Sequence, residues 1–425
     1  MITLFTENIT PRLSYIATTL FGESIIITDD ETNFNSFLGK KINYSSKENI
    51  PSDLWITPVT LLQEINIKPQ QNECFFWEDL QVFFKTSGTI PFDIFAASFY
   101  LITRYEEYNV DYEKDDYGNY HHKNSLAYQE NFLKIPLINL WIQKIENIFQ
   151  LNIQHSTFKI IPTYDIDIAF AYKHHPLYIQ VGGILKDIIH FRKSVLDRVL
   201  GLLGLKKDPY DLYEWLNELH EKYHLNAIYF FLVAKERSQF DKNSSRKKIK
   251  SLIQKIYSQN QIGIHPSFKS NSEKGLLKNE IEYLEEIINR NINKSRQHYL
   301  QLKFPITYRS LIQEGITNDY TLGYGTHNGF RTSYCKPFFW YDLENEKKTE
   351  LVIHPFCFMD ANSIFEQNLN TDEALSEMKY YYEQVKSVNG EFSFIMHNHF
   401  LTEQEKWKDW RKTYTNFLQQ INDLQ

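Results

Sequence analysis

Two aspartates, Asp165 and Asp167, stand at the end of a short apolar run that begins at Lys159. Residues two apart on an extended strand point to the same face, so the two carboxylates can share a metal ion or divide the duties of base and ligand. Apolar residues flank both acids, a setting that solvated surface acids do not need. We therefore interpret the stretch as a strand that delivers two carboxylates to a site, in preference to a loop with solvated acids.

Titratable residues also stand at the ends of other apolar runs. The runs that we interpret as strands are 158–163, 227–233, 261–264, 298–304, 318–322, 350–355 and 391–397. Asp165, His265, Asp319, His354 and His397 lie at or just beyond the ends of such runs. Barrels of parallel strands gather their active sites at the carboxyl ends of the strands. The pattern therefore predicts one convergent site, where a neutral imidazole such as that of His265 can bind a metal ion.

Helical patterns separate these strands. We expect one helix from Asp208 to about Tyr223, since Asp208 and Pro209 suit a helix start, and another over 250–258. Strands that alternate with helices predict a βα array. The first 150 residues instead alternate short strand-like runs, at 24–28 and 54–57, with helices that include a core helix over 92–108.

The chain has 425 residues, more than a single hydrophobic core usually serves. We predict an N-terminal α/β accessory domain over 1–150. A (β/α) barrel over 151–425 follows, with a helical insertion near 176–223.

Composition excludes some classes of partner. The net charge of −7 provides no basic field for nucleic acid, and no nucleic-acid-binding motif is present. The three cysteines have no metal-binding or redox spacing and are expected to be reduced, packed thiols. No signal-peptide pattern opens the chain and no window approaches about 18 apolar residues, so we expect a cytoplasmic, non-spanning protein.

Residues 183–207 are strongly apolar on one side and basic on the other. Such a segment can lie on a membrane surface. It can also pack as an ordinary amphipathic helix on the barrel or on the neighbouring domain.

Five short motifs in chain order resemble those of the polysaccharide deacetylase family, the carbohydrate esterases of the nodulation-factor deacetylase type. They are Thr163-Tyr-Asp-Ile-Asp167, Gly263-Ile-His265, Arg296, Asp319 and Met396-His397. A two-domain branch common in Bacteroidetes is more similar still, through Phe92-Asp-Ile-Phe-Ala-Ala-Ser-Phe-Tyr100, Arg104-Tyr-Glu-Glu107, Arg296-Gln-His-Tyr-Leu300, Gly329-Phe-Arg331 and Tyr341-Asp-Leu343. The resemblance implies a distorted (β/α) barrel of the polysaccharide-deacetylase type behind a smaller α/β domain.

The resemblance also implies roles for these residues. Asp165 would be the general base and Asp167 a metal ligand together with His265, while His397 would be the general acid. Arg296 would hold the base, and Asp319 would do the similar task for His397. A metal with one open position activates water and polarises an acyl oxygen, so the chemistry is self-consistent.

One position departs from the family pattern. The family's second motif is His-x-x-x-His, whereas Lys269 stands four residues after His265. A lysine ammonium cannot replace an imidazole ligand. Either His298, or Ser267 or Ser270 after it, completes the site, or the site binds metal weakly or not at all.

Three further residues are candidates for binding substrate. His354 and Asp360 follow a predicted strand and would line the pocket. Arg331 could bind a substrate carboxylate or phosphate, or form a structural ion pair.

We therefore expect a metal-dependent hydrolase that removes N-acetyl or O-acetyl groups from a sugar or glycan precursor. The metal would be zinc, with cobalt or nickel as alternatives. The substrate would be a nucleotide-linked or lipid-linked sugar, and the 183–207 segment would contact the inner membrane face. Two other hypotheses stay open: a metal-dependent glycosyltransferase with Asp165 and Asp167 as ligands, and a non-catalytic carbohydrate-binding or assembly module.

Overall fold

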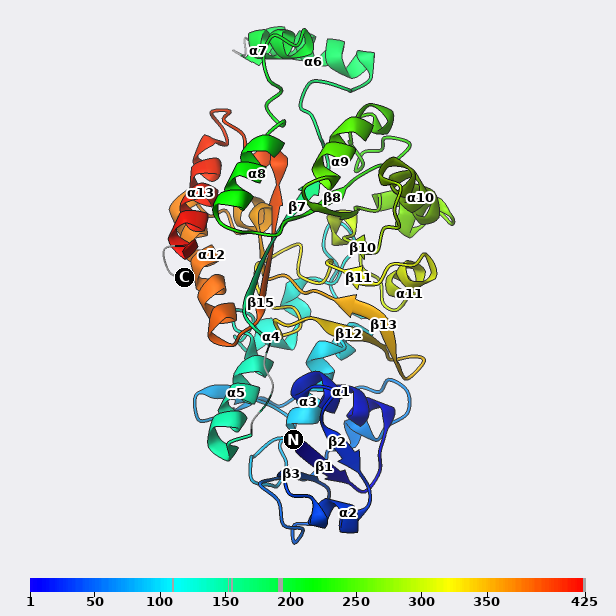
Figure 1. The fold of residues 1–425 in the computed structure, drawn as a ribbon, viewed down its shortest axis with the longest axis vertical. Helices are drawn as coiled ribbons and strands as arrows, with labels where there is room; N and C mark the ends of the chain where they lie inside the picture. The colour runs from blue at the N-terminus through cyan, green and yellow to red at the C-terminus, as the bar shows by residue number, and fades with distance from the viewer. Residues whose placement is uncertain (109–110, 152, 154–155, 190–193, 423–425) are drawn as a thin grey trace.

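The protein folds as two α/β units, each built on its own sheet (Figure 1). The computed structural model describes residues 1–108, 111–151, 153, 156–189 and 194–422. The first unit, here called the N-terminal unit, runs from Ile2 to Phe149, and the larger sheet begins at Lys159.

The N-terminal unit contains a four-stranded parallel sheet with strand order β2-β1-β3-β4. Its strands are β1 (Ile2–Thr6), β2 (Ile26–Thr28), β3 (Lys40–Tyr44) and β4 (Leu54–Ile56), and a hairpin of β5 (Phe75–Trp77) and β6 (Leu80–Val82) follows. The helices are α1 (Pro11–Phe21), α2 (Glu31–Ser36), α3 (Ile94–Ile102), α4 (Leu126–Gln129) and α5 (Leu137–Phe149). Helix α3 is buried at every position, and the Asp93 side chain caps it by accepting a hydrogen bond from the backbone N–H of Ala96.

The larger sheet has nine strands in the order β12-β13-β11-β10-β9-β8-β7-β15-β14. They are β7 (Lys159–Ile166), β8 (Ile228–Phe231), β9 (Gln261–Ile264), β10 (Lys294–Ser295), β11 (Asn318–Asp319), β12 (Phe338–Asp342), β13 (Lys347–Ile353), β14 (Phe358–Met359) and β15 (Glu391–His397). Every neighbouring pair is parallel except β12 with β13. No pairing among the described residues joins β12 to β14, so the ladder is open and a closed barrel stays a prediction.

Helices connect and flank these strands. They are α6 (Leu177–Ile189), α7 (Ser194–Leu202), α8 (Tyr213–Lys222), α9 (Lys250–Tyr257), α10 (Leu276–Ile288), α11 (Ile306–Gln313), α12 (Thr371–Ser387) and α13 (Lys408–Asn422). Helices α8, α12 and α13 lie on one side of the central strands, and α9, α10 and α11 lie on the other (Figure 1). Helices α6 and α7 project from the end of the molecule opposite the N-terminal unit.

Two predicted elements are wrong. The stretch 298–304 is not a strand: the strand is β10, and residues His298–Leu300 form a 3-10 turn in which Tyr299 and Leu300 have positive φ. Asp208 does not begin a helix, because α8 starts only at Tyr213. Its carboxylate instead accepts hydrogen bonds from the backbone N–H groups of residues 171–173.

A buried ionic network fastens the N-terminal unit to the larger sheet. Arg331 donates two hydrogen bonds to Glu107, at 2.9 and 2.6 Å, and Arg104 donates to the same carboxylate at 2.7 Å. All three side chains are buried, and one hydrophobic cluster spans both units. The two units therefore share a core.

The cysteines form no disulfide, and no membrane-spanning helix is found among the described residues. All three cysteines are free, and Cys335 and Cys357 are buried. Within the described residues, no helix has the length and apolar character needed to cross a bilayer.

Candidate active site

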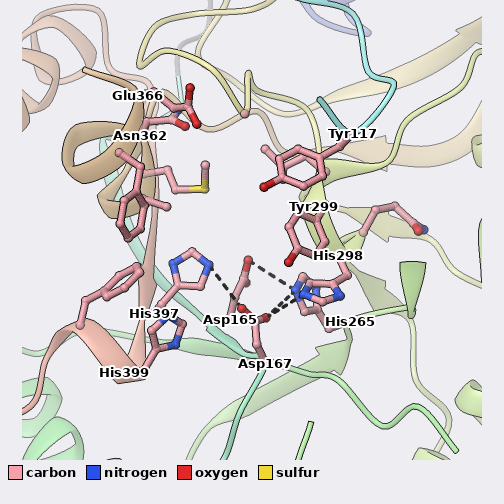
Figure 2. Close-up of a pocket in the computed structure, with 17 residues that line it drawn as sticks. Tyr117, Asp165, Asp167, His265, His298, Tyr299, Asn362, Glu366, His397 and His399 are labelled. Atoms are coloured by element: carbon pink, nitrogen blue, oxygen red, sulfur yellow. Dashed lines mark ion pairs between the residues drawn. The ribbon is translucent and has the colours of Figure 1, made fainter. Parts of the chain in front are cut away.

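The carboxyl ends of the central strands meet at a pocket of about 300 Å³ (Figure 2). Asp165 and Asp167 lie at its floor, His265 and His298 form one side, and His397 and His399 form the opposite side. The other lining residues are Tyr117, Gln297, Tyr299, Leu300, Gly325, Met359, Ala361, Asn362, Phe365, Glu366 and Phe400. The chain therefore brings its strand-end acids and histidines to one place.

Asp167, His265 and His298 form a cluster suited to a metal ion. Their ligand atoms all lie within 4.8 Å of one another. Oδ1 of Asp167 is 3.1 Å from Nε2 of His265 and 3.6 Å from Nε2 of His298. Two donors held by one tetrahedral zinc ion lie about 3.4 Å apart. Both distances from Asp167 therefore have the size that a shared cation requires.

The hydrogen bonds behind the two imidazoles orient them as ligands. Nδ1 of His265 lies 2.5 Å from the backbone oxygen of Arg296, and Nδ1 of His298 lies 3.0 Å from Oδ1 of Asp241. A neutral ring that donates from Nδ1 presents the lone pair of Nε2 to the pocket. Supporting acceptors of this kind accompany most metal-binding histidines.

One carboxylate oxygen of Asp167 lacks a hydrogen-bond partner among the described residues. Its Oδ1 is buried, and no residue in the described part of the chain provides it with a hydrogen bond of good geometry. Burial alone would raise the pKa of Asp167, but His298, His265 and His397 hold it well below its usual range. An ionised, unsatisfied oxygen that faces two imidazole nitrogens fits a divalent cation.

Asp165 lies beside this cluster and is tied to Arg296. Nη1 of Arg296 donates to Oδ1 of Asp165 at 2.9 Å and to the hydroxyl of Thr163 at 2.7 Å. The second oxygen, Oδ2, lies 3.8 Å from Nε2 of His265. The guanidinium therefore fixes one carboxylate oxygen and leaves the other toward the pocket, an arrangement that suits a base better than a ligand.

His397 faces the cluster from β15, where it is the register partner of Asp165 on β7. Asp360 accepts hydrogen bonds of 2.6 Å from both Nδ1 and the backbone N–H of His397. Burial lowers the pKa of His397, but Asp360, Asp167 and Asp165 outweigh it and raise the pKa to about 10. Nε2 lies 3.9 Å from Oδ2 of Asp167, so the ring presents a proton to the pocket.

Four sequence-based assignments need correction. Asp360 does not line the pocket as predicted: its side chain is fully buried and holds His397. Asp319 does not support His397: it accepts hydrogen bonds from the hydroxyls of Ser295 and Thr321 at 2.6 and 2.8 Å, and Asp360 takes the place beside the imidazole. His354 lies outside the pocket. Its ring bonds Glu391 at 2.7 Å and stacks on a tyrosine.

Arg331 is also outside the pocket, because its guanidinium is committed to Glu107 and to the backbone oxygen of Gly323. It is 1% exposed, so it offers no free surface to a substrate. Of the two roles considered for Arg331, the structure places it in the ion pair.

Of the three candidates for the third ligand, only His298 lies at the pocket. Lys269 does not line the pocket; its ammonium is 3.9 Å from Glu273. Ser267 and Ser270 do not line it either, and the hydroxyl of Ser270 donates to the backbone oxygen of Ser267. His298 lies in the cluster.

Sequence reasoning missed several pocket residues. Asp241 orients His298 from a loop without a recognisable motif. Tyr117 comes from the N-terminal unit and packs on Tyr299 with 4.4 Å between ring centroids. His399 had a signal, since it lies two residues after His397, and its Nδ1 is buried without a partner among the described residues.

Residues 2–154 match a family model described as "Family of unknown function (DUF7033)". No curated protein matches the chain.

Three solved structures resemble the fold of the chain. One, from Mycobacterium smegmatis, is assigned as a polysaccharide deacetylase (12% identity, TM-score 0.41, covering 63% of this chain and 85% of that one). A polysaccharide deacetylase from Bacillus cereus has 9% identity and a TM-score of 0.31, covering 62% and 88%. A carbohydrate esterase domain of a xylanase from the hindgut metagenome of Trinervitermes trinervoides has 9% identity and a TM-score of 0.29, covering 63% and 84%.

Proposed function

We propose that the protein is a metal-dependent hydrolase that removes N-acetyl or O-acetyl groups from a sugar or glycan precursor. One observation carries this proposal: an Asp167, His265 and His298 cluster stands between an arginine-held carboxylate and a carboxylate-held imidazole. Hydrolysis of an amide needs these three parts, which are an electrophilic centre, a base and an acid.

Asp167, His265 and His298 would hold the cation. When bound, a divalent cation such as zinc supplies Lewis acidity, because it lowers the pKa of a water and polarises an acyl oxygen. Cobalt or nickel would suit the same nitrogen and oxygen donors.

The chain's own groups would move the protons. Asp165 would accept the proton of the attacking water through the oxygen that Arg296 does not bind. His397, kept protonated by Asp360, would donate a proton from Nε2 to the departing amine or alcohol. The 3.9 Å between Nε2 and Asp167 places this donor next to the cation ligands.

The pocket lining favours an uncharged sugar ring. Tyr117, Tyr299, Phe365 and Phe400 provide aromatic surface, and no lysine or arginine of the described residues lines the pocket. A nucleotide-linked or lipid-linked substrate would therefore place its phosphates outside the pocket. The acetylated ring would lie inside, against the aromatic side chains.

The two other hypotheses receive less support. A glycosyltransferase would need Asp165 as a second metal ligand, but Arg296 binds it. The non-catalytic module was suggested by the loss of a histidine at position 269, and His298 offers an imidazole in its place.

Metal analysis and acetate release test the proposal together. Asp167→Asn should lose the metal, whereas Asp165→Asn should keep it and lose activity by about 10²–10⁴-fold on zinc-loaded protein. Triacetylchitotriose and an O-acetylated xylo-oligosaccharide are suitable probes. Asp29→Asn, at an exposed position of the N-terminal unit, is the matched control and should change neither quantity. Full activity in Asp165→Asn, or native metal content in Asp167→Asn, would contradict the proposal.

A further inference from the structure

Helix α6 presents an apolar stripe to solvent. Its large side chains recur at helical spacing along one side: Leu177 (74% exposed), Tyr178 (72%), Val181 (47%), Leu185 (54%), Ile188 (52%) and Ile189 (69%). Leu196, Leu203 and Leu205 extend the exposed surface across α7 and beyond. These nine are among the 23 large apolar side chains that are strongly exposed in the described residues, although the stretch 177–205 is a small part of the chain. A concentration of this kind marks an interaction surface.

One ion pair of the same helical hairpin faces inward. Asp187 of α6 is buried and accepts a hydrogen bond of 2.7 Å from Nε of Arg198 on α7. The Arg198 guanidinium also lies 4.6 Å from the ring centroid of Tyr172, and it packs under Gly183. On α6 an ionised side chain is therefore buried while the large apolar side chains face solvent, unlike a helix that packs its apolar side on a soluble core. The apolar stripe does not cover the larger sheet, as the packed-helix interpretation of 183–207 required.

The charge of the segment is opposite to that of the whole protein. Residues 173–207 contain seven Lys or Arg and two Asp, a net charge of +5, in a chain of net charge −7. Both acids are paired, Asp187 with Arg198 and Asp197 with Lys206. Two of the basic residues, Arg192 and Lys193, lie outside the described residues. An anionic surface would therefore attract this segment, although the chain as a whole is acidic.

The position of the hairpin leaves the stripe accessible. Helices α6 and α7 project beyond the rest of the molecule, to which two extended segments join them (Figure 1). A projecting element with aliphatic side chains, a tyrosine near the helix start and basic residues on both flanks matches a helix that lies in a bilayer interface.

We propose that the hairpin of α6 and α7 docks the protein on an anionic lipid bilayer. The stripe from Leu177 to Ile189 enters the boundary between headgroups and acyl chains, and the flanking lysines contact lipid phosphates. The Asp187–Arg198 pair holds the two helices together on the side away from the lipid. This inference is independent of the proposed hydrolase activity, since no pocket residue takes part in it.

Vesicle flotation of the full chain at 150 mM salt tests the proposal. We expect binding to vesicles of phosphatidylcholine with 30% phosphatidylglycerol. Affinity for pure phosphatidylcholine should be about 25-fold lower if only two basic side chains reach the headgroups, because each is worth about a factor of five. Leu185→Glu with Ile188→Glu should reduce binding by at least about 100-fold, since two buried aliphatic side chains are lost and two charges are added.

A matched control places the same charges on other exposed apolar positions. Leu38→Glu with Ile65→Glu, at side chains that are 102% and 73% exposed, should bind vesicles like the unaltered chain. Unfolding midpoints of all three proteins should agree, and Leu185→Ser with Ile188→Ser provides a milder stripe variant if the glutamates disturb folding.

Two results would overturn the proposal. The first is a chain that does not bind anionic vesicles, or whose stripe variants bind as well as the control. The second is self-association without vesicle binding, measured by light scattering and lost in the stripe variants, which would assign the stripe to a second copy of the chain. Acetate release is not a readout here, so failure of the hydrolase proposal remains a separate result.

Discussion

Arg331 provides a test that separates a structural ion pair from a substrate-binding role. Its guanidinium donates two hydrogen bonds to Glu107 and a third, of 2.8 Å, to the backbone oxygen of Gly323. Burial raises the pKa of Glu107, but Arg331 and Arg104 together hold it below its usual range. The pair therefore stays ionised at the junction of the two units.

The two single substitutions should differ in cost. Removing one partner of a buried pair costs about 3–5 kcal/mol. In Arg331→Met, Glu107 keeps the hydrogen bond of 2.7 Å from Arg104, so we expect the lower end, about 3 kcal/mol. In Glu107→Leu, Arg331 keeps only the backbone oxygen of Gly323, so we expect the upper end, about 5 kcal/mol.

Urea unfolding of the single and double variants measures these values. Because each single variant leaves the other member of the Glu107–Arg331 pair without its partner, the double variant should cost less than the sum of the two, with a coupling of about 1–3 kcal/mol. At temperatures where Arg331→Met is folded, its KM for the acetylated probe should be unchanged. An Arg331→Met protein of native stability with a raised KM would refute the reasoning and return Arg331 to the substrate.

Three further predictions concern the pocket and its surroundings. His298→Ala should lower zinc affinity by at least about 100-fold in chelator competition, because losing a ligand costs more than losing the hydrogen-bond partner behind a ligand. Lys269→His should leave the zinc affinity unchanged, and a gain of affinity in this variant would contradict the assignment of His298 as the third ligand. Tyr117→Ala should raise KM for the sugar several-fold with metal content and kcat preserved, and an unchanged KM would remove the aromatic wall from the binding site. Burial lowers the pKa of His220 to about 4, below its unfolded value of about 6.5. The neutral ring therefore contributes fully to the free energy of unfolding above pH 6.5, and this contribution is lost as the pH falls through 4. Unfolding at pH 7.5 and 4.5 should show a loss approaching 3 kcal/mol that His220→Gln lacks; equal losses in both proteins would contradict it.

The positions of six of the nine strands of the larger sheet could be predicted from the chain, because their apolar runs stop at a turn or a titratable residue; β10, β12 and β14 were missed. The bounds expected at 261–264 and 391–397 coincide with β9 and β15. The run at 298–304 misled because its aromatic residues, Tyr299 and Phe304, favour strands, yet Tyr299 and Leu300 adopt φ values of 56° and 52°. Strands β10 and β14, which no predicted run covered, have two residues each, too few for a periodic pattern to appear.

Partners that are distant in the chain could not be predicted. Asp360 supports His397 because β14 pairs in parallel with β15, with Met359 opposite Ile395, and this register brings the following carboxylate to the imidazole. The same is true of Glu107 and Arg331, which are 224 residues apart. Neither pair can be recognised from the sequence near either residue, because any acid near a strand end is an equally suitable partner for the imidazole or the guanidinium.

His298, the second histidine of the cluster, shows how a residue outside the expected motif can complete a set of donors. His265 follows β9 and His298 follows β10, and these parallel strands are neighbours, so their carboxyl ends deliver side chains to one point. The positive φ of Tyr299 and Leu300 turns the chain immediately after His298 instead of continuing the strand. Asp241 then orients the ring from the other side. A lysine at position 269 is therefore compatible with a complete site. His298, which follows β10, provides the imidazole that a histidine at position 269, in the loop after β9, would otherwise provide.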